Sequence, residues 1–127
     1  MSKTISSSDA AAPVASYSQA ITAGDLVFVS GQIPLDPKSN KLISNSIEAA
    51  TEQSLRNVQR ILEAAELDFR HVVKASVFLI NTEDYTGMDV TYKSIMPQPF
   101  PAREAVFVAG LPKNARVEIS VIAHTQR

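Results

Sequence analysis

The 127-residue sequence contains no cysteine and no tryptophan, and only four of its residues are glycine. Without cysteine the chain can form no disulfide, no thiolate nucleophile and no thiolate metal site. The glycines nowhere show the Gly-x-Gly spacing of nucleotide-binding loops. The two histidines, His71 and His124, lie at the ends of expected elements with no carboxylate at ligand spacing, so we expect no metal site.

The sequence also lacks an excess of charge and a long apolar run. Twelve basic and 13 acidic residues give a formal net charge of −1, so no general field attracts nucleic acid or anionic lipid. No apolar run approaches the roughly 20 residues that span a bilayer, and no hydrophobic signal core is present. Residues 1–12 are rich in serine and alanine, and we expect them to form a flexible start.

The composition that remains is typical of one globular domain over residues 1–127. Hydrophobic residues make up 45% of the chain and charged residues 20%, which argues against disorder. A chain of this length can bury about two thirds of its unfolded surface. We therefore expect a single domain with a substantial core.

Hydrophobic periodicity predicts two helices. The first is expected over residues 46–67, where Asn45 and Glu48 have capping-box spacing and an apolar stripe recurs at steps of three and four: Thr51, Leu55, Val58, Ile61, Leu62 and Ala65. The second is expected to begin at Asn81 or Thr82 and to end before Pro97. Its stripe comprises Tyr85, Met88, Tyr92 and Ile95.

The remaining apolar segments predict strands over 17–21, 26–30, 72–80, 104–109 and 116–123, with an irregular loop over 34–45. The first two flank a tight turn at 23–25 and predict a hairpin. In the strand at 72–80, Val73, Ala75, Val77 and Leu79 form one wholly apolar face.

The order of elements predicts an α+β fold, a mixed sheet with two helices on one face. Its other face alternates apolar and polar side chains, including Phe78 beside Lys74 and Ile122 beside Glu118. No helix is left to cover that face. A half-apolar face of this kind is typical of a subunit interface, so we expect a homo-oligomer.

The segment Phe100-Pro101-Ala102-Arg103 is the main candidate for chemistry. Pro101 restricts the backbone ahead of the strand, and a guanidinium held there is a preformed fork for a carboxylate. A surface ion pair is the alternative. Tyr17, Gly31 and Glu118 are the other polar groups that could converge on one small anion, although Tyr17 could instead anchor a strand and Glu118 could pair at an interface. No Gly-x-Ser-x-Gly nucleophile motif occurs.

These segments together resemble the RidA/YjgF (RutC) family of imine and enamine deaminases, including small fungal members. The resemblance covers nearly the whole chain and rests on Tyr17-Ser18-Gln19-Ala20, Val29-Ser30-Gly31-Gln32-Ile33-Pro34, Glu52-Gln53-Ser54-Leu55-Arg56-Asn57-Val58, Val72-Val73-Lys74, Phe100-Pro101-Ala102-Arg103 and Val117-Glu118-Ile119. It implies a chorismate-mutase-like fold and a homotrimer with a central barrel. It also implies active sites in the clefts between subunits.

The resemblance further implies hydrolysis of 2-aminoacrylate, 2-iminopropanoate or 2-iminobutanoate to 2-oxo acids and ammonia, without a metal or organic cofactor. Arg103 would bind the substrate carboxylate, Tyr17 and the Gly31 backbone would shape the pocket, and Glu118 would relay protons. Two positions depart from many relatives. Ala105 replaces a cysteine on the face of Arg103, and Asp89 replaces an asparagine in the second helix.

Two alternative functions, and the compartment, stay open on the sequence alone. A non-catalytic member that binds metabolites or regulates isoleucine biosynthesis or mitochondrial maintenance fits the two departures. RNA cleavage, reported for some relatives, is disfavoured because no basic stripe is present. The resemblance implies a cytoplasmic protein, with the mitochondrial matrix as the other compartment to test.

Overall fold

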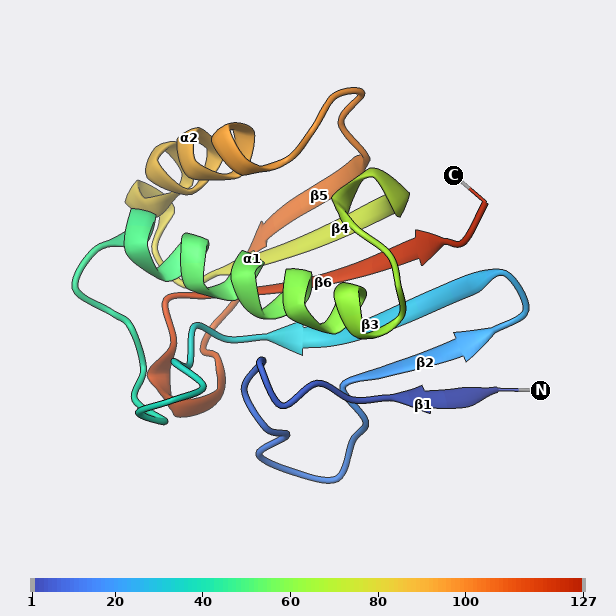
Figure 1. The fold of residues 1–127 in the computed structure, drawn as a ribbon. Coiled ribbons are helices and arrows are strands. Elements are labelled where there is room, and N and C mark those ends of the chain that lie inside the picture. Colours follow the sequence, from blue (N-terminus) through green and yellow to red (C-terminus); the bar gives the residue numbers. More distant parts are fainter. Residues whose placement is uncertain (1, 127) are drawn as a thin grey trace.

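The computed structural model describes residues 2–126 and places two helices against one face of a six-stranded mixed sheet (Figure 1). The strands follow the order β1-β2-β3-β6-β4-β5, and the β4–β5 pair is parallel whereas the other pairs are antiparallel. The elements are β1 Lys3–Ile5, β2 Ala20–Ala23, β3 Leu26–Gln32, α1 Ile47–Ala64, β4 Val72–Leu79, α2 Tyr85–Ile95, β5 Ala102–Phe107 and β6 Val117–His124, with short 3₁₀ turns η1 Phe69–His71, η2 Thr82–Asp84 and η3 Pro112–Asn114. The predicted α+β architecture is confirmed.

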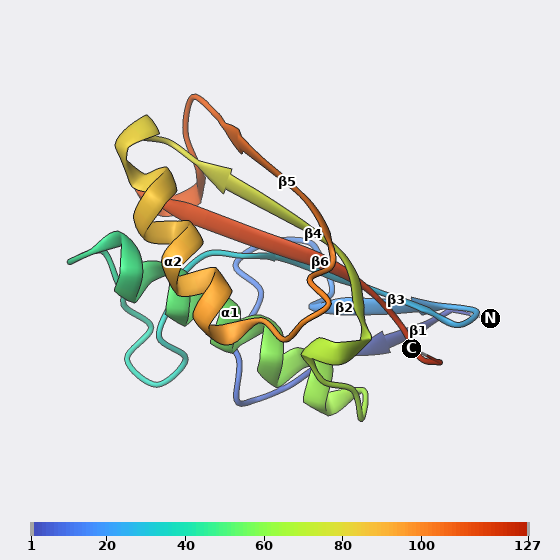
Figure 2. The ribbon, with the colours of Figure 1, turned by 90° about the horizontal axis from the view of Figure 1, so that it is seen from above.

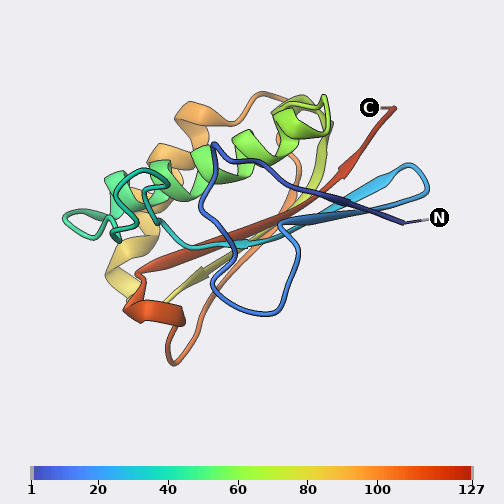
Figure 3. The ribbon, with the colours of Figure 1, turned by 60° about the horizontal axis from the view of Figure 1, so that its bottom comes forward.

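Both helices lie on the same side of the sheet, which Figures 2 and 3 show from two further directions. The buried side chains of α1 and α2 pack with the inward-facing residues of the central strands in one core cluster. The opposite face carries Phe28, Phe78, Val106 and Ile122, and Phe28 and Val106 are 42% and 41% exposed. The uncovered, half-apolar face predicted from the sequence is therefore present.

The predicted hairpin is confirmed, and it gains a third strand. Ala23 pairs with Leu26 around Gly24 and Asp25, and Gly24 has a positive φ of 60° that suits glycine in such a turn. Residues 3–5, placed by the sequence in a flexible start, form β1 against β2. A three-residue strand is too short for a periodic signal, and its pairing depends on the distant edge of β2.

A buried glutamine fixes the chain between β1 and β2. The Gln19 amide donates to the carbonyl of Ala11 at 2.8 Å, and its carbonyl oxygen accepts the N–H of Ser7 at 2.6 Å. The side chain of Gln19 is 3% exposed, so these bonds satisfy polar atoms that water cannot reach. Residues 7–11 are thereby tied to the start of the sheet.

Helix α1 follows the predicted stripe, but its N-cap lies one residue later than the proposed cap. Ser46, rather than Asn45, caps the helix, and its hydroxyl accepts the N–H of Ala49 at 3.0 Å. Leu55, Val58, Ile61 and Leu62 are fully buried. The stripe is therefore correct, whereas the expected pairing of Asn45 with Glu48 is not observed.

Two local features, a register shift in β4 and a close contact at Gly87 of α2, shape the other elements. In β4, a register shift between Val72 and Lys74 makes Val72, not Val73, the buried residue before Ala75. In α2, a Cβ built on Gly87 would lie 2.6 Å from Ile47 Cγ2 and 2.5 Å from a Glu48 oxygen. Gly87 thus permits the close contact of α2 with the start of α1, which offsets its low helix propensity.

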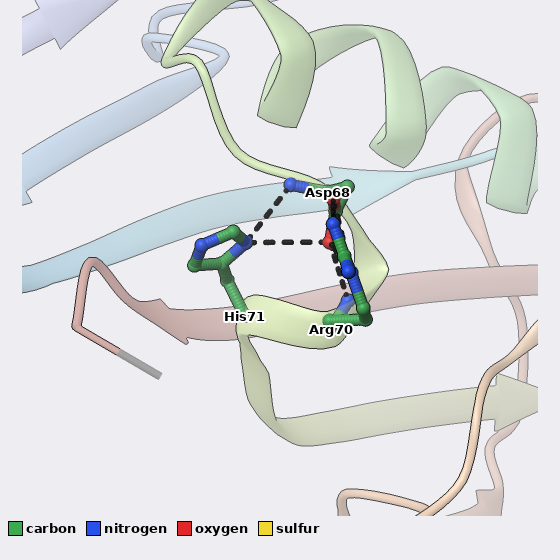
Figure 4. Close-up of polar contacts among 3 residues, drawn as sticks. All are labelled: Asp68, Arg70 and His71. Carbon is green, nitrogen blue, oxygen red and sulfur yellow. Dashed lines mark hydrogen bonds and ion pairs between the residues drawn. The ribbon is translucent and has the colours of Figure 1, made fainter.

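A small polar cluster precedes β4 (Figure 4). Asp68 caps η1 by accepting the N–H of Arg70 at 2.9 Å, and its own N–H donates to His71 Nδ1 at 3.1 Å. Asp68 Oδ1 also lies 3.3 Å from His71 Nδ1, a contact that becomes an ion pair only when Nδ1 is protonated. The chain thus turns Asp68 back onto His71.

Candidate functional site

Arg103 is held at the start of β5 with its side chain on the helix-covered face of the sheet. It pairs with the buried Ala75 of β4, and its Nη1 donates to Asp89 Oδ1 at 2.9 Å. Its Nη2 donates to the hydroxyl of Tyr85 at 2.8 Å, and the guanidinium carbon lies 4.7 Å from the ring centre of Tyr92. Three residues of α2 therefore fix the plane of the guanidinium.

A cavity of about 310 Å³ opens beside this arginine. We call it the Arg103 cavity, and it is lined by Asp89, Tyr92, Lys93, Phe100, Pro101 and Arg103. Burial raises the pKa of Tyr92, whose hydroxyl finds no hydrogen-bond partner among residues 2–126. A guanidinium has five N–H donors, and the two bonds above use two of them. The remaining donors can bind an acid.

Glu118 lies on the uncovered face, next to a bulge in β3. Val29 pairs with Val121 and Gln32 with Ile119, so β3 carries one extra residue at Ser30 and Gly31. A Cβ built on Gly31 would overlap the Glu118 carboxylate, so only glycine leaves room for this side chain. Burial raises the pKa of Glu118 above its ordinary value.

Tyr17 closes a second cavity over Gly31 and Glu118. This Glu118 cavity has a volume of about 270 Å³ and is lined by Val14, Ala15, Tyr17, Ser30, Gly31, Ile33, Pro112 and Glu118. Tyr17 is 41% exposed, and its hydroxyl accepts the N–H of Val14 at 3.2 Å. The ring is thus held at the rim of the cavity rather than in the core.

The structure separates the four predicted anion-binding residues into two groups. Ala75 of β4 pairs with Arg103 on one side and with Val121 of β6 on the other. Val121 is three residues from Glu118, so the Cα atoms of Arg103 and Glu118 lie about 14 Å apart. Their side chains also point to opposite faces of the sheet. Arg103 and Asp89 share one cavity, whereas Tyr17, Gly31 and Glu118 share the other, so one small acid cannot contact both groups within a single chain.

Comparison with known proteins places this arrangement in a family. A family model described as Endoribonuclease L-PSP matches residues 7–125. The 2-iminobutanoate/2-iminopropanoate deaminase of Bos taurus is 41% identical over 121 residues, which covers 95% of this chain and 88% of the relative. The chain belongs to the RidA/YjgF family.

Two crystal structures extend the likeness to the fold. RidA from an Antarctic Psychrobacter bacterium has a TM-score of 0.92 and 38% identity, with 96% of this chain and 98% of that chain covered. Escherichia coli TdcF with bound serine has a TM-score of 0.91 and 31% identity, with the same coverage. The RidA-type fold expected from the sequence is therefore confirmed.

Ala105 packs next to the core, and its predicted contact with substrate stays a prediction. It lies on the same face of β5 as Arg103, as strand alternation predicted, but it packs against the buried core and does not line the Arg103 cavity. A cysteine at this position would therefore contact the core in this chain. Of Asp89 and Ala105, only Asp89 hydrogen-bonds to Arg103.

Sequence reasoning missed the two tyrosines that orient Arg103. Tyr85 and Tyr92 were assigned to the apolar stripe of the second helix, yet Tyr85 is 39% exposed and bonds to Arg103. A signal was present, because Tyr85, Asp89 and Tyr92 follow the i, i+4, i+7 spacing of one helix face. Such spacing brings a carboxylate and two rings to one point.

A larger hollow lies elsewhere and has a structural explanation. It measures about 590 Å³ and is bounded by Asp9, the loop at Asp36 and the exposed face of α1. Its arginines are paired within α1, Arg56 with Glu52 at 3.7 Å and Arg60 with Glu63 at 2.9 Å. These exposed pairs form an ordinary solvated helix face.

Proposed function

We propose that the chain is a 2-iminobutanoate/2-iminopropanoate deaminase. The observation that carries the proposal is Arg103, oriented by α2 beside an open cavity with unused N–H donors. Support comes from relatives at about 40% identity that bear this name. The bound serine of TdcF supports recognition of a small amino acid by this fold.

Arg103 binds the carboxylate of the substrate. An enamine such as 2-aminoacrylate first tautomerises to the imine, and water then adds to the imine carbon. The carbinolamine collapses, its C–N bond breaks, and a 2-oxo acid and ammonia leave. Because the imine is already reactive, most of the acceleration comes from holding it beside a positioned water.

Glu118 serves as the proton relay in this scheme, with Tyr17 and Gly31 shaping its side of the pocket. Burial raises the pKa of Glu118 in the direction of neutral pH. A carboxyl group whose pKa lies closer to the operating pH accepts and donates protons more readily. Its cavity and the Arg103 cavity lie on opposite faces of one sheet. A complete site therefore requires the Arg103 cavity of one copy and the Glu118 cavity of another.

This requirement supports an assembly with sites between subunits, which we propose to be a homotrimer. The uncovered face offers the apolar surface for such an assembly, including Phe28 and Val106, which are exposed in the isolated chain. On the same face, Lys74 pairs with Glu104 at 3.0 Å, and Ser76 hydrogen-bonds to Glu104. These polar groups can fix the register between copies.

Other partners and the compartment follow from the same proposal. The Arg103 cavity suits a substrate of a few carbon atoms, and a net charge of −1 gives RNA no electrostatic attraction. Among residues 2–126, no helix is long and apolar enough to cross a membrane. As the family resemblance implies, we propose the cytoplasm as the compartment, with the mitochondrial matrix as the second compartment to test.

An Arg103→Ala substitution tests the proposal. Imines released from threonine by a pyridoxal-phosphate dehydratase are the substrate, and the formation of 2-oxobutanoate above the spontaneous rate is the measurement. Loss of a charge-assisted, two-pronged contact should lower kcat/KM by about 100-fold. Arg103→Lys keeps the charge without the fork and should lose about tenfold.

The oligomeric state is measured on the same samples to separate binding from assembly. An Arg103→Ala protein that remains assembled and as active as the wild type would contradict the role of Arg103. A wild-type protein that binds 2-oxobutanoate without accelerating imine hydrolysis would favour the non-catalytic alternative.

A further inference from the structure

The Arg103 cavity carries a carboxylate as well as a guanidinium. Asp89 lies in its wall, 2.9 Å from Arg103 Nη1, and its side chain is 47% exposed. The side chain of Arg103 itself is only 18% exposed. A ligand acid that reaches this arginine therefore approaches Asp89 as well, and the charge of Asp89 acts on it.

We infer that Asp89 makes the Arg103 cavity selective for imino acids whose only anionic group is the carboxylate beside the imine. This inference rests on the proposed function and names the substrate class of that site. Asp89 excludes imino acids with a second carboxylate by repelling that group. Substrates with short uncharged side chains meet no such penalty.

Counting the charges of the lining supports the inference. Arg103 and Lys93 contribute two positive charges and Asp89 one negative charge, so the lining carries one net positive charge. One bound carboxylate neutralises it. A second carboxylate would leave an uncompensated negative charge a few ångströms from Asp89, where partial burial weakens the screening by water.

The geometry allows Asp89 to stay in place while a ligand binds. Asp89 takes one N–H of Nη1 and Tyr85 one N–H of Nη2, which leaves three guanidinium donors for the ligand. Asp89 need not be displaced, so its charge persists in the complex. The pair therefore orients the guanidinium and sets the charge of the cavity at the same time.

An Asp89→Asn substitution isolates the charge. Asparagine has nearly the same shape, and its carbonyl oxygen can still accept from Nη1, so the orientation of Arg103 is retained. Glu83→Gln is the matched control, because Glu83 is an exposed acid just ahead of α2 that does not line the cavity. Both substitutions remove one negative charge.

Titration calorimetry with two stable 2-oxo acids measures the selectivity directly. The probes are 2-oxobutanoate, with one carboxylate, and 2-oxoglutarate, with two. The wild type and Glu83→Gln should bind 2-oxobutanoate at least about tenfold more tightly, and Asp89→Asn should reduce this preference by about tenfold. Added salt should also reduce the wild-type preference, since charge repulsion is screened.

The outcomes separate the inference from the proposed function. An unchanged preference in Asp89→Asn would mean that size, not charge, excludes the larger acid, and it would overturn the inference alone. Equal affinity of the wild type for both acids would do the same. Failure of the wild type to bind either acid would overturn the inference together with the carboxylate-binding role of Arg103.

Discussion

Two arginine–aspartate pairs connect the α2 region to the sheet, and they differ in burial. Asp84, just before α2, is bound by Arg116 through Nη2 at 2.7 Å and Nε at 3.3 Å, and its side chain is 4% exposed. Asp89, one turn further along, has a single bond to Arg103 and is 47% exposed. In the first pair Asp84 is buried from solvent, whereas the second pair borders the Arg103 cavity.

The comparison shows how one chemical pair can serve two purposes. Arg116 also donates to the carbonyl of Ser44 at 3.3 Å, so it ties the loop before α1, the start of α2 and β6 together. Arg103 keeps donors unused and faces open space. A pair whose acid is buried is costly to break, while a pair with spare donors beside a cavity is available to a ligand.

A third pair extends the comparison to the surface. Asp68 and Arg70 lie 2.7 Å apart, but their side chains are 43% and 76% exposed (Figure 4). Solvent screening makes such a pair weak. The three pairs therefore predict a graded series of effects on stability.

The largest effect is expected at Asp84. Asp84→Ala leaves the Arg116 guanidinium without its buried partner, and the free energy of unfolding should fall by about 3 kcal/mol. Denaturant unfolding followed by circular dichroism measures the change. Asp84→Asn, which retains an acceptor oxygen, should lose less. A loss below about 1 kcal/mol for Asp84→Ala would show that burial does not distinguish this pair from the others.

These pairs also mark what the sequence could and could not predict. The stripe of α1, the hairpin turn at Gly24 and the alternation of β6 depend on neighbouring residues, and the sequence predicted all three. Asp84 and Arg116 are 32 residues apart, and neither showed a local signal of their bond. Long-range polar pairing depends on strand order and helix placement, which periodicity does not encode.

For the candidate site too, the sequence predicted the residues but not their arrangement in space. Arg103, Glu118, Gly31 and Tyr17 were identified one by one from their residue types and segments. Their distribution over two faces depends on the register of β5 and β6 against β4, which the sequence did not reveal. In β4 the buried residue is Val72 rather than Val73 for a similar reason. One bulged residue reverses the face on which the preceding residues of the strand lie.

An intermediate effect is expected for the pair at the Arg103 cavity. In a double-mutant cycle with Asp89→Ala and Arg103→Ala, the coupling energy should be about 0.5–1 kcal/mol, because Asp89 is half exposed and makes one bond. Unfolding of the wild type, both single variants and the double variant gives this value. A coupling energy well above about 1 kcal/mol would indicate a structural pair rather than one available to a ligand.

The smallest effect is expected at Asp68 and depends on pH. The hydrogen bond from Arg70 is the main cause that lowers the pKa of Asp68 from 3.8 to about 2. A lowered carboxyl pKa means that the charged form stabilises the folded state, so the contribution is fully present above pH 3.8 and is lost as the pH falls through about 2. Because the pair is exposed and screened by solvent, that contribution should be small.

Asp68→Asn isolates this charge, since asparagine also caps a helical turn. The wild type should be more stable than Asp68→Asn at pH 6, and the difference should shrink towards zero between pH 3.8 and pH 2. Urea unfolding of both proteins across this range measures it. A difference that persists at pH 2 would assign the effect of Asp68 to its backbone contacts rather than to its ion pair. The ranking of the three pairs by burial would then not extend to the surface.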